Sequence, residues 1–262
     1  MPLEYLPVLP VAAFSALDEQ LILGGPELRR RFLDRLAFQL RPATLDLLLR
    51  YRRALRQRNT LLQQGKTGET LEAFDRELAQ VGTQLILARL SALEALQIFL
   101  EEELASLGWL FSKPVFHYHS QDGLAASAAA GDYQFLTTLR RWRRQEQVRG
   151  CTLVGPHRDD LKILLQGRPA REQLSAGQAK LLATALRLAA VAVTRVKRKV
   201  APLLVFDDVD AKLDGQVLAR LLPRIAAMGG QAILSTAHPE MVLGRLPDAT
   251  VVKVCQDTLT AT

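Results

Sequence analysis

The fold is decided by two stretches of the chain, Leu174-Ser175-Ala176-Gly177-Gln178 and Leu203-Leu204-Val205-Phe206-Asp207-Asp208. In the first stretch, Ser175 fits a helix N-cap, and Gln178, three residues later, completes a capping box. Apolar residues at helical spacing continue from there to Val196, so the stretch predicts the start of a long amphipathic helix. An ordinary capped helix and a helix start with a binding function both fit this pattern.

Gly177 favours the binding function. A glycine in the first turn costs about 1 kcal/mol of helix stability relative to alanine, and it lets another molecule approach the backbone closely. The free N–H groups, the positive end of the helix dipole and the Ser175 hydroxyl would suit a phosphate. The sequence therefore predicts an anion site at residues 175–178.

The second stretch is four apolar residues followed at once by Asp207 and Asp208, which indicates a short buried strand with an acidic end. Ligands of open parallel sheets bind beyond the carboxyl ends of the strands. One aspartate there can hold Mg²⁺, and a neighbouring acid can orient an attacking water. The alternative is an ordinary polar turn. A further predicted strand at 231–234 also ends in polar residues, Ser235 and Thr236.

Four motifs follow one another along the chain: Gly24-Gly25-Pro26-Glu27-Leu28-Arg29-Arg30-Arg31-Phe32-Leu33-Asp34, Cys151-Thr152-Leu153-Val154-Gly155-Pro156-His157-Arg158-Asp159-Asp160-Leu161, the helix start at 174–178 and the strand ending in Asp207-Asp208. In order and spacing they resemble the RecF family, bacterial DNA replication and repair ATPases of the ABC/SMC superfamily. The first two motifs are highly specific, whereas Leu-Ser-x-Gly-Gln alone indicates only some ABC-type ATPase. The resemblance spans nearly the whole chain.

The resemblance implies a nucleotide site with ATP and Mg²⁺ as cofactors. Ser175, Gly177 and Gln178 would contact the γ-phosphate of ATP held by the opposite subunit of a head-to-head dimer. Asp207 would be the Walker B magnesium ligand, and Asp208 would occupy the position of the catalytic acid. The chain would thus supply one half of a composite site.

The resemblance also implies interface positions. Asp214 would close the D-loop at the dimer interface, and Ser235 or Thr236 would occupy the region of the switch residue that senses the γ-phosphate. His157 and Arg158 belong to a family motif whose role the sequence leaves open, because a β-hairpin turn and a direct contact fit it equally well.

The chain departs from the family pattern at the phosphate loop. RecF proteins begin with a strand and a G-x-x-G-x-G-K-[ST] loop that holds the phosphates, and the 262 residues contain no such motif. Gly65-Lys66-Thr67 does not replace it, because no glycine stands five residues earlier. Lys212 takes the place of an acidic D-loop residue and Ala211 that of a common serine, which puts coupling across the interface in question. We expect the chain alone to be inactive as an ATPase.

Composition and cysteine content indicate a cytoplasmic protein. With 48% hydrophobic residues over 262 positions, the chain can bury a substantial core. Cys151 and Cys255 are too few for a disulfide framework. The apolar stretch 181–193 contains Arg187 and is shorter than the ~20 residues that span a bilayer. We expect no signal peptide and no membrane partner.

The net charge predicts a polyanionic partner. Lys and Arg outnumber Asp and Glu by 34 to 27, and arginines cluster at 29–31, 50–58 and 140–144. On a predicted helix at 41–63, Arg52 and Arg56 share one face, and Arg50 and Arg53 share an adjacent one. Such a run is usually only a solvated face. Together with the resemblance, however, it predicts contacts with DNA phosphates that read little sequence.

The pattern along the chain predicts an α/β fold: part of an ABC-type ATPase head, with a P-loop NTPase-like sheet and flanking helices, interrupted by a mainly helical arm. We expect a head segment at 1–26 with a strand at 8–14, an arm at 27–149, and at 150–262 the remaining head with the signature, Walker B and D-loop motifs. Within the arm we expect helices at 41–63, 71–107 and 133–147, a loop at 65–68 and a looser segment at 109–131.

Two functional hypotheses follow. In the first, the chain is part of a RecF-like ATPase that dimerises around ATP, binds gapped DNA and its single-strand/double-strand junctions, and works with recombination mediator proteins. In the second, it is a non-enzymatic DNA-binding or scaffold protein that complements another ATPase subunit. The sequence upstream of Met1 in the genome would discriminate between them.

Overall fold

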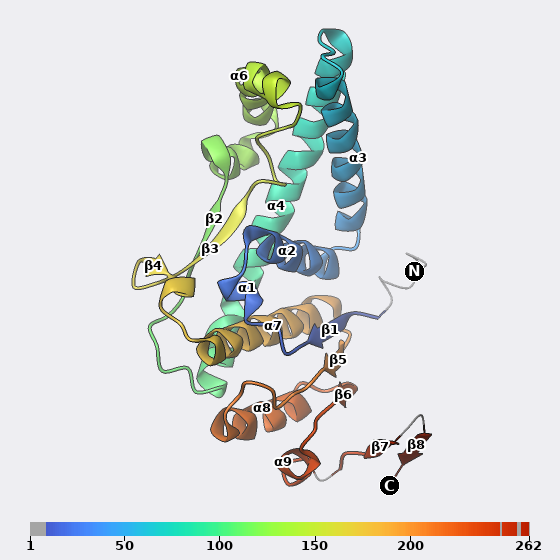
Figure 1. Cartoon of the computed structure of the whole chain (residues 1–262), viewed down its shortest axis with the longest axis vertical. Helices are drawn as coiled ribbons and strands as arrows, with labels where there is room; N and C mark the ends of the chain where they lie inside the picture. The colour runs from blue at the N-terminus through green and yellow to red at the C-terminus, as the bar shows by residue number, and fades with distance from the viewer. Residues whose placement is uncertain (1–8, 247, 256–257, 262) are drawn as a thin grey trace.

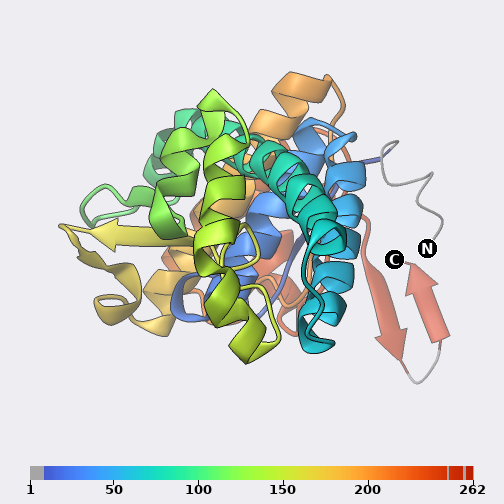
Figure 2. The ribbon, with the colours of Figure 1, turned by 90° about the horizontal axis from the view of Figure 1, so that it is seen from above.

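The computed structural model describes residues 9–246, 248–255 and 258–261. A helical arm rises from a body built around a small parallel sheet (Figure 1). The view from above shows that the arm helices lie over this body (Figure 2).

Three sheets occur in the described part of the chain. The central sheet is parallel throughout, with the strand order β1-β5-β6. A second, antiparallel sheet has the order β2-β3-β4, and β7 and β8 form a separate hairpin. The strand bounds are β1 Val11–Phe14, β2 Val115–His119, β3 Asp160–Leu165, β4 Arg168–Pro169, β5 Leu203–Phe206, β6 Ala232–Leu234, β7 Val252–Cys255 and β8 Thr258–Ala261.

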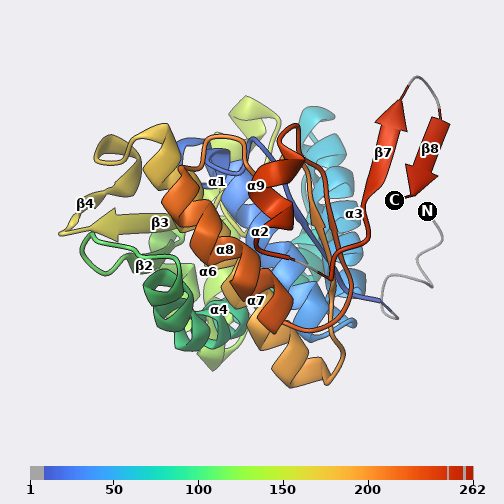
Figure 3. The same cartoon turned by 90° about the horizontal axis from the view of Figure 1, so that it is seen from below.

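The helices fall into an arm group and a body group. α3, α4 and α6 form the arm, whereas α7 and α8 pack in the body, as the view from below shows (Figure 3). The bounds are α1 Gln20–Leu23, α2 Pro26–Leu40, α3 Thr44–Gln63, α4 Glu69–Ser106, η1 Gln121–Gly123, α5 Leu124–Ser127, η2 Ala128–Ala130, α6 Tyr133–Arg149, η3 Ala170–Glu172, α7 Ala176–Arg198, α8 Gly215–Ala227 and α9 Pro239–Leu243.

Most predicted elements are present with shifted ends. The predicted strand at 8–14 is shorter, since β1 begins at Val11 and Val8 lies outside the described residues, as does the rest of 1–8. The expectation of a looser segment at 109–131 was wrong in part, because β2 lies within it. Valine and aromatic side chains at 115–119 were the signal for that strand, and β3 supplies the distant partner that completes it.

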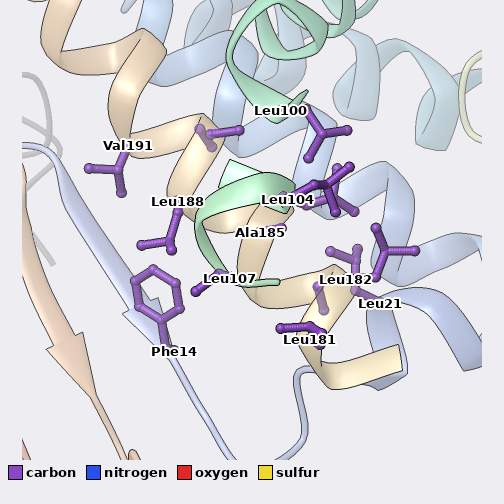
Figure 4. Close-up of a cluster of buried hydrophobic side chains, with 14 of the residues drawn as sticks. Phe14, Leu21, Leu100, Leu104, Leu107, Leu181, Leu182, Ala185, Leu188 and Val191 are labelled. Carbon is purple, nitrogen blue, oxygen red and sulfur yellow. The ribbon is translucent and has the colours of Figure 1, made fainter. Parts of the chain in front are cut away.

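The main core lies between the central sheet and α7. Phe14 and Phe206 stack with their ring centroids 4.0 Å apart, and both side chains are buried. The end of α4 packs against the same core through Leu104, and Leu107, just beyond the helix, lies close to Leu188 of α7 (Figure 4). The long arm helix therefore begins in the arm and ends inside the body.

A second core holds the arm together. Tyr51 of α3, Leu78 and Ile86 of α4 and Phe135 of α6 belong to it. Gly82 lies where α4 passes these helices, and a Cβ there would come within 2.5 Å of the Phe135 ring. Glycine is therefore required at this position by close packing, despite its cost within a helix.

Several clustered arginines are structural, which corrects the expectation that the clusters face a partner. Arg58 is fully buried, and it pairs with Asp75 of α4 at 2.7 Å and with Glu146 of α6 at 2.6 Å. Arg29 is also buried and contacts Asp160 at 2.8 Å. A buried arginine cannot reach DNA, so these positions hold elements together instead.

One helix among the described residues, α4, is long and apolar enough to cross a membrane, judged by length and composition alone. However, 44% of its most apolar window is buried inside the molecule. Its apolar side chains contribute to both cores, which accounts for its composition without a membrane.

Candidate functional site

The carboxyl ends of β5 and β6 bring predicted site residues together. The Ser235 hydroxyl donates to Asp207 Oδ1 at 3.1 Å and accepts from the Asp208 backbone N–H at 2.9 Å. All three residues are exposed. Two predicted strand ends that are 28 residues apart therefore form one polar edge of the sheet, as parallel pairing requires.

The backbone at Asp208 is bent. Its φ of +51° lies in the left-handed region, which aspartate tolerates better than most residues because its short side chain can bond locally. The next residue, Val209, is buried and donates its N–H to the Ser235 carbonyl at 3.0 Å. The chain thus turns sharply after β5, which leaves both carboxylates exposed to solvent.

The capping box predicted at the start of α7 is confirmed. The Gln178 N–H donates to Ser175 Oγ at 3.3 Å, and the Ser175 N–H donates to Gln178 Oε1 at 2.9 Å. Ser175 Oγ acts here as an acceptor, so its own proton remains available to a ligand. The cap and a phosphate contact are therefore compatible.

The fold itself does not require glycine at 177. A Cβ there would meet only the Lys212 carbonyl oxygen, at 3.5 Å, which is an ordinary van der Waals distance. Packing therefore gives no reason for a residue that weakens the helix. The prediction that Gly177 serves close approach by another molecule is compatible with this geometry.

The loop after β5 lies against the start of α7. Lys180 of α7 donates to the Ala211 carbonyl, and Lys212 forms an ion pair with Glu19 at 2.5 Å. Glu19 is 4% exposed. Burial opposes its charged form, but the hydrogen bond from the Lys212 ammonium, a backbone hydrogen bond and the positive charges of Lys212 and Lys180 together outweigh this, so the pKa of Glu19 is lowered. No local sequence pattern indicates this pair, because its opposite charges lie 193 residues apart.

The other predicted interface residues have local structural partners. Asp214 is the N-cap of α8 and accepts from the N–H groups of Gln216 and Val217 at 2.9 and 2.8 Å. Thr236 Oγ1 accepts from the His238 N–H at 2.9 Å. The Asp214 side chain is exposed, so its capping role leaves it accessible from outside.

The described residues contain no group of three or more His, Cys, Asp or Glu that could hold a metal ion. The oxygens available at the sheet edge are those of Asp207, Asp208 and Ser235. Mg²⁺ in nucleotide sites takes one or two carboxylates and completes its shell with phosphates and waters. The residues present fit that kind of partial shell.

The motif at 151–161 forms a buried polar junction between arm and body. His157 contacts the Tyr51 hydroxyl at 2.7 Å and the Thr152 carbonyl at 3.1 Å. The hairpin hypothesis for this residue was wrong, because residues 155–158 form a turn before β3, while the hairpin turn lies between β3 and β4. In the structure, His157 makes partly buried contacts within the chain.

Burial shifts two pKa values at this junction in opposite directions. It lowers the pKa of His157 to about 4, because the imidazolium would lose its hydration. It raises the pKa of Asp159 to about 6, although the Tyr118 hydroxyl donates to Oδ2 at 2.8 Å. Asp159 Oδ1 is buried without a hydrogen-bond partner, which explains why the charged form is disfavoured.

The predicted DNA-facing strip lies on the outer side of α3. Arg52, Arg53 and Arg56 are exposed and form no ion pair with the described residues. Arg50 approaches Asp46 at 3.9 Å, an exposed pair of little energetic weight. These four guanidinium groups are therefore available to a partner.

Comparison with known proteins places this geometry in a family, although no protein-family model matches the chain. A solved structure of the recombination mediator protein RecF with ATPrS, in the RecFOR pathway, superimposes with a TM-score of 0.86 at 26% identity. That match covers 99% of this chain and 69% of the RecF chain. A solved structure of RecF with ATP gives a TM-score of 0.81 at 25% identity. The α/β fold with its parallel sheet and long helical segment is thus that of RecF.

Curated relatives agree with the structural match. The DNA replication and repair protein RecF of Myxococcus xanthus is 34% identical over 255 residues, which are 95% of this chain and 67% of that protein. RecF of Synechococcus sp. strain CC9605 is 36% identical over 245 residues, 91% of this chain and 67% of that protein. The chain spans about two thirds of the length of these relatives. It belongs to the RecF family of DNA replication and repair proteins.

Proposed function

We propose that this protein acts in recombinational gap repair as part of an ABC-type dimeric clamp that binds ATP and DNA. The observation that carries the proposal is the polar edge at the ends of β5 and β6, with the start of α7 packed against the same loop. A capped helix start beside two exposed carboxylates suits the phosphates and metal of a nucleotide. The relatives' solved structures with ATP and ATPrS support this choice of ligand.

The proposed roles follow the geometry of each residue. Ser175, with its free hydroxyl proton, and Gly177, with its open backbone, would meet the γ-phosphate of ATP held by a partner, and Gln178 would hold the cap in shape. Asp207 would bind Mg²⁺, and Asp208 would orient the attacking water. Asp214, Ser235 and Thr236 would line the interface near the nucleotide.

A glycine-rich phosphate loop would come from another polypeptide or from a segment outside this sequence. Without it, the 262 residues lack the main phosphate donors. We therefore propose that this part of the protein provides the signature half of a composite ATP site in a dimer, rather than a self-sufficient ATPase.

DNA would bind along α3 through Arg50, Arg52, Arg53 and Arg56. Their exposure supports this role, and guanidinium groups pair well with phosphates. We further propose gapped DNA as substrate, recombination mediator proteins as partners and a cytoplasmic location, in keeping with the relatives. The domain division would be a head at 1–26 and 150–262 of the P-loop NTPase type, with the arm at 27–149.

The test is association in trans. The chain, mixed with an intact RecF of the same source, is expected to form a heterodimer only when ATP is present. Ser175→Arg would place bulk and a cation where the phosphate approaches, and it is expected to abolish the association. Ser91→Arg is the matched control, because Ser91 is an exposed residue of α4 and belongs to none of the motifs proposed to meet the nucleotide. Analytical ultracentrifugation with and without ATP measures the outcome.

The alternative function is a non-enzymatic DNA-binding or scaffold protein. It is favoured by one observation, the local capping roles of Ser175 and Asp214, which explain these residues without a nucleotide. Association that ignores ATP, or that survives Ser175→Arg, would support this alternative.

A further inference from the structure

The outward face of α6 carries arginines without intramolecular partners. Three arginines of the helix are exposed: Arg140, Arg144 and Arg149. None of their side chains makes a hydrogen bond or ion pair with the described residues. Arg141 and Arg143 of the same helix differ, since they pair with Asp122 and Asp75, each at 2.5 Å. Some arginines of α6 therefore form ion pairs that stabilise the fold, whereas the others point into solvent.

No acidic side chain of α6 balances this outward charge. Glu146 is the single acid in the helix, and it is fully buried against Arg58 and accepts from the Leu153 N–H. A solvated surface helix normally mixes both signs of charge. On the outward face of α6, by contrast, all charged side chains are cationic.

The same buried acid fixes the helix in place. Arg58 of α3 joins Asp75 of α4 and Glu146 of α6, and all three side chains are 0% exposed. Arg143 also reaches Asp75. This ion network binds α6 to both long arm helices, so its outward arginines project from a rigid base. A rigid base lowers the entropic cost of binding a partner.

An open hollow of about 390 Å³ lies within this face, lined by Arg144, Gln145, Val148 and Arg149. Its lining offers two guanidinium groups and one amide donor around a single apolar side chain, which is 85% exposed. Protein interfaces normally need a larger apolar centre. Donor-rich linings of this kind suit the oxygens of a phosphate.

We propose that the outward face of α6 is a second DNA-backbone contact on the arm, and that Arg144 and Arg149 flank one phosphate in this hollow. The inference rests on the proposed DNA-binding function and extends it from α3 to another helix. The contact is sequence-independent, because the lining presents phosphate donors on an exposed helix face and nothing that enters a groove.

The experiment measures duplex DNA binding by fluorescence anisotropy over a range of salt concentrations. Arg144→Glu/Arg149→Glu is expected to weaken binding and to reduce the slope of log K against log salt by about 1, since one phosphate contact is lost and each contact contributes roughly 0.9. The matched control is Arg168→Glu/Arg171→Glu, which makes the same change in net charge on exposed residues of β4 and η3. Thermal unfolding confirms that each variant is folded.

The outcomes separate this inference from the proposed function. An unchanged slope in Arg144→Glu/Arg149→Glu, together with a reduced slope in Arg52→Glu/Arg56→Glu, would overturn the α6 contact and leave α3 as the DNA surface. Unchanged slopes in both variants would overturn both. An equal loss in the β4 and η3 control would show that only net charge matters. Competition by poly-L-glutamate as effective as DNA at equal charge would assign the face to an acidic polypeptide instead.

Discussion

At the scale of single residues, side chains of the candidate site have structural roles that leave them free to meet a ligand. Ser175 caps a helix through its oxygen while its proton stays free. Gly177 has ordinary space around its missing Cβ. Lys212, which replaces an acid expected by resemblance, pairs with buried Glu19 and so joins the loop after β5 to the segment after β1. The lysine thus has a partner of opposite charge within the chain itself.

Gly177→Ala separates stability from binding. Alanine at this position is expected to raise the helix's contribution to stability by up to about 1 kcal/mol, since the new Cβ meets one oxygen at 3.5 Å. The methyl group would also stand where a partner's phosphate approaches. Thermal unfolding should therefore show an equal or higher melting temperature, while ATP-dependent association with intact RecF weakens. A loss of both would mean that the fold needs glycine here.

The Glu19 and Lys212 pair is tested by a double-mutant cycle. Lys212→Met leaves a buried carboxylate without its partner and is expected to destabilise the fold by about 2 kcal/mol. Glu19→Gln removes the charge, so the double variant should lose less than the sum of the single variants. Urea unfolding measures each free energy. Strict additivity would show that the two side chains do not interact in solution.

At the scale of elements, buried polar contacts connect arm and body where apolar packing alone would leave the orientation free. Arg89 of α4 pairs with Asp34 of α2 at 2.7 Å and donates to the Pro156 carbonyl at 2.7 Å. Tyr118 of β2 links Arg89 to Asp159. The turn at 155–158 and the residue after it are therefore contacted by α4, by β2 and, through Tyr51 and His157, by α3, which explains why this motif contains a half-buried His157 and a buried Asp159.

This junction predicts a specific pH dependence of stability. The pKa of His157 in the folded protein, about 4, lies below its ordinary 6.5. Its contribution to the free energy of unfolding is therefore present above pH 6.5 and is lost as the pH falls towards 4. The folded pKa of Asp159, about 6, lies above its ordinary 3.8, so its contribution is present below that value and is lost as the pH rises through 6. The two effects on the free energy of unfolding oppose each other, each on the order of 3 kcal/mol.

Single variants expose the cancellation. Asp159→Asn is expected to leave the histidine effect alone, so stability should rise more steeply between about pH 4 and 6.5 than in the unmodified chain. His157→Gln should show the reverse, with stability that falls over the same range. Free energies from urea unfolding at several pH values measure both. Parallel curves for the two variants would contradict the assigned shifts.

At the scale of the whole molecule, one long helix joins two cores. α4 contributes Leu78 and Ile86 to the arm core and Leu104 to the body core. Glu103, near its end, is fully buried and pairs with Arg224 of α8 at 2.5 Å. A partner bound on the arm and a nucleotide at the sheet edge would therefore act on opposite ends of a connected framework.

The 262-residue chain is expected to bind Mg-ATP weakly and to hydrolyse it negligibly on its own. In the proposed site, the motifs present would contact nucleotide that is already held elsewhere, and no glycine-rich phosphate loop occurs among these residues. Isothermal titration calorimetry with Mg-ATP measures the affinity. Clear low-micromolar binding would show that the phosphate site has been assigned wrongly.

The sequence alone determined the elements whose signals are local. The capping box at Ser175, the strand before Asp207 and the loop between α3 and α4 follow from neighbouring residues, so each was predicted with its position. The parallel sheet was also predicted, because short buried strands alternate with amphipathic helices.

Only the tertiary structure decided which charged side chains are exposed and can therefore reach a partner. Arg56 and Arg58 stand two positions apart in one basic run, yet one is exposed and the other is completely buried. The difference depends on Asp75 and Glu146, which come from distant helices. The Glu19 and Lys212 pair and the β2 and β3 pairing arise in the same way. Contacts between distant segments leave no periodic pattern in the sequence, because they depend on how completed elements pack together.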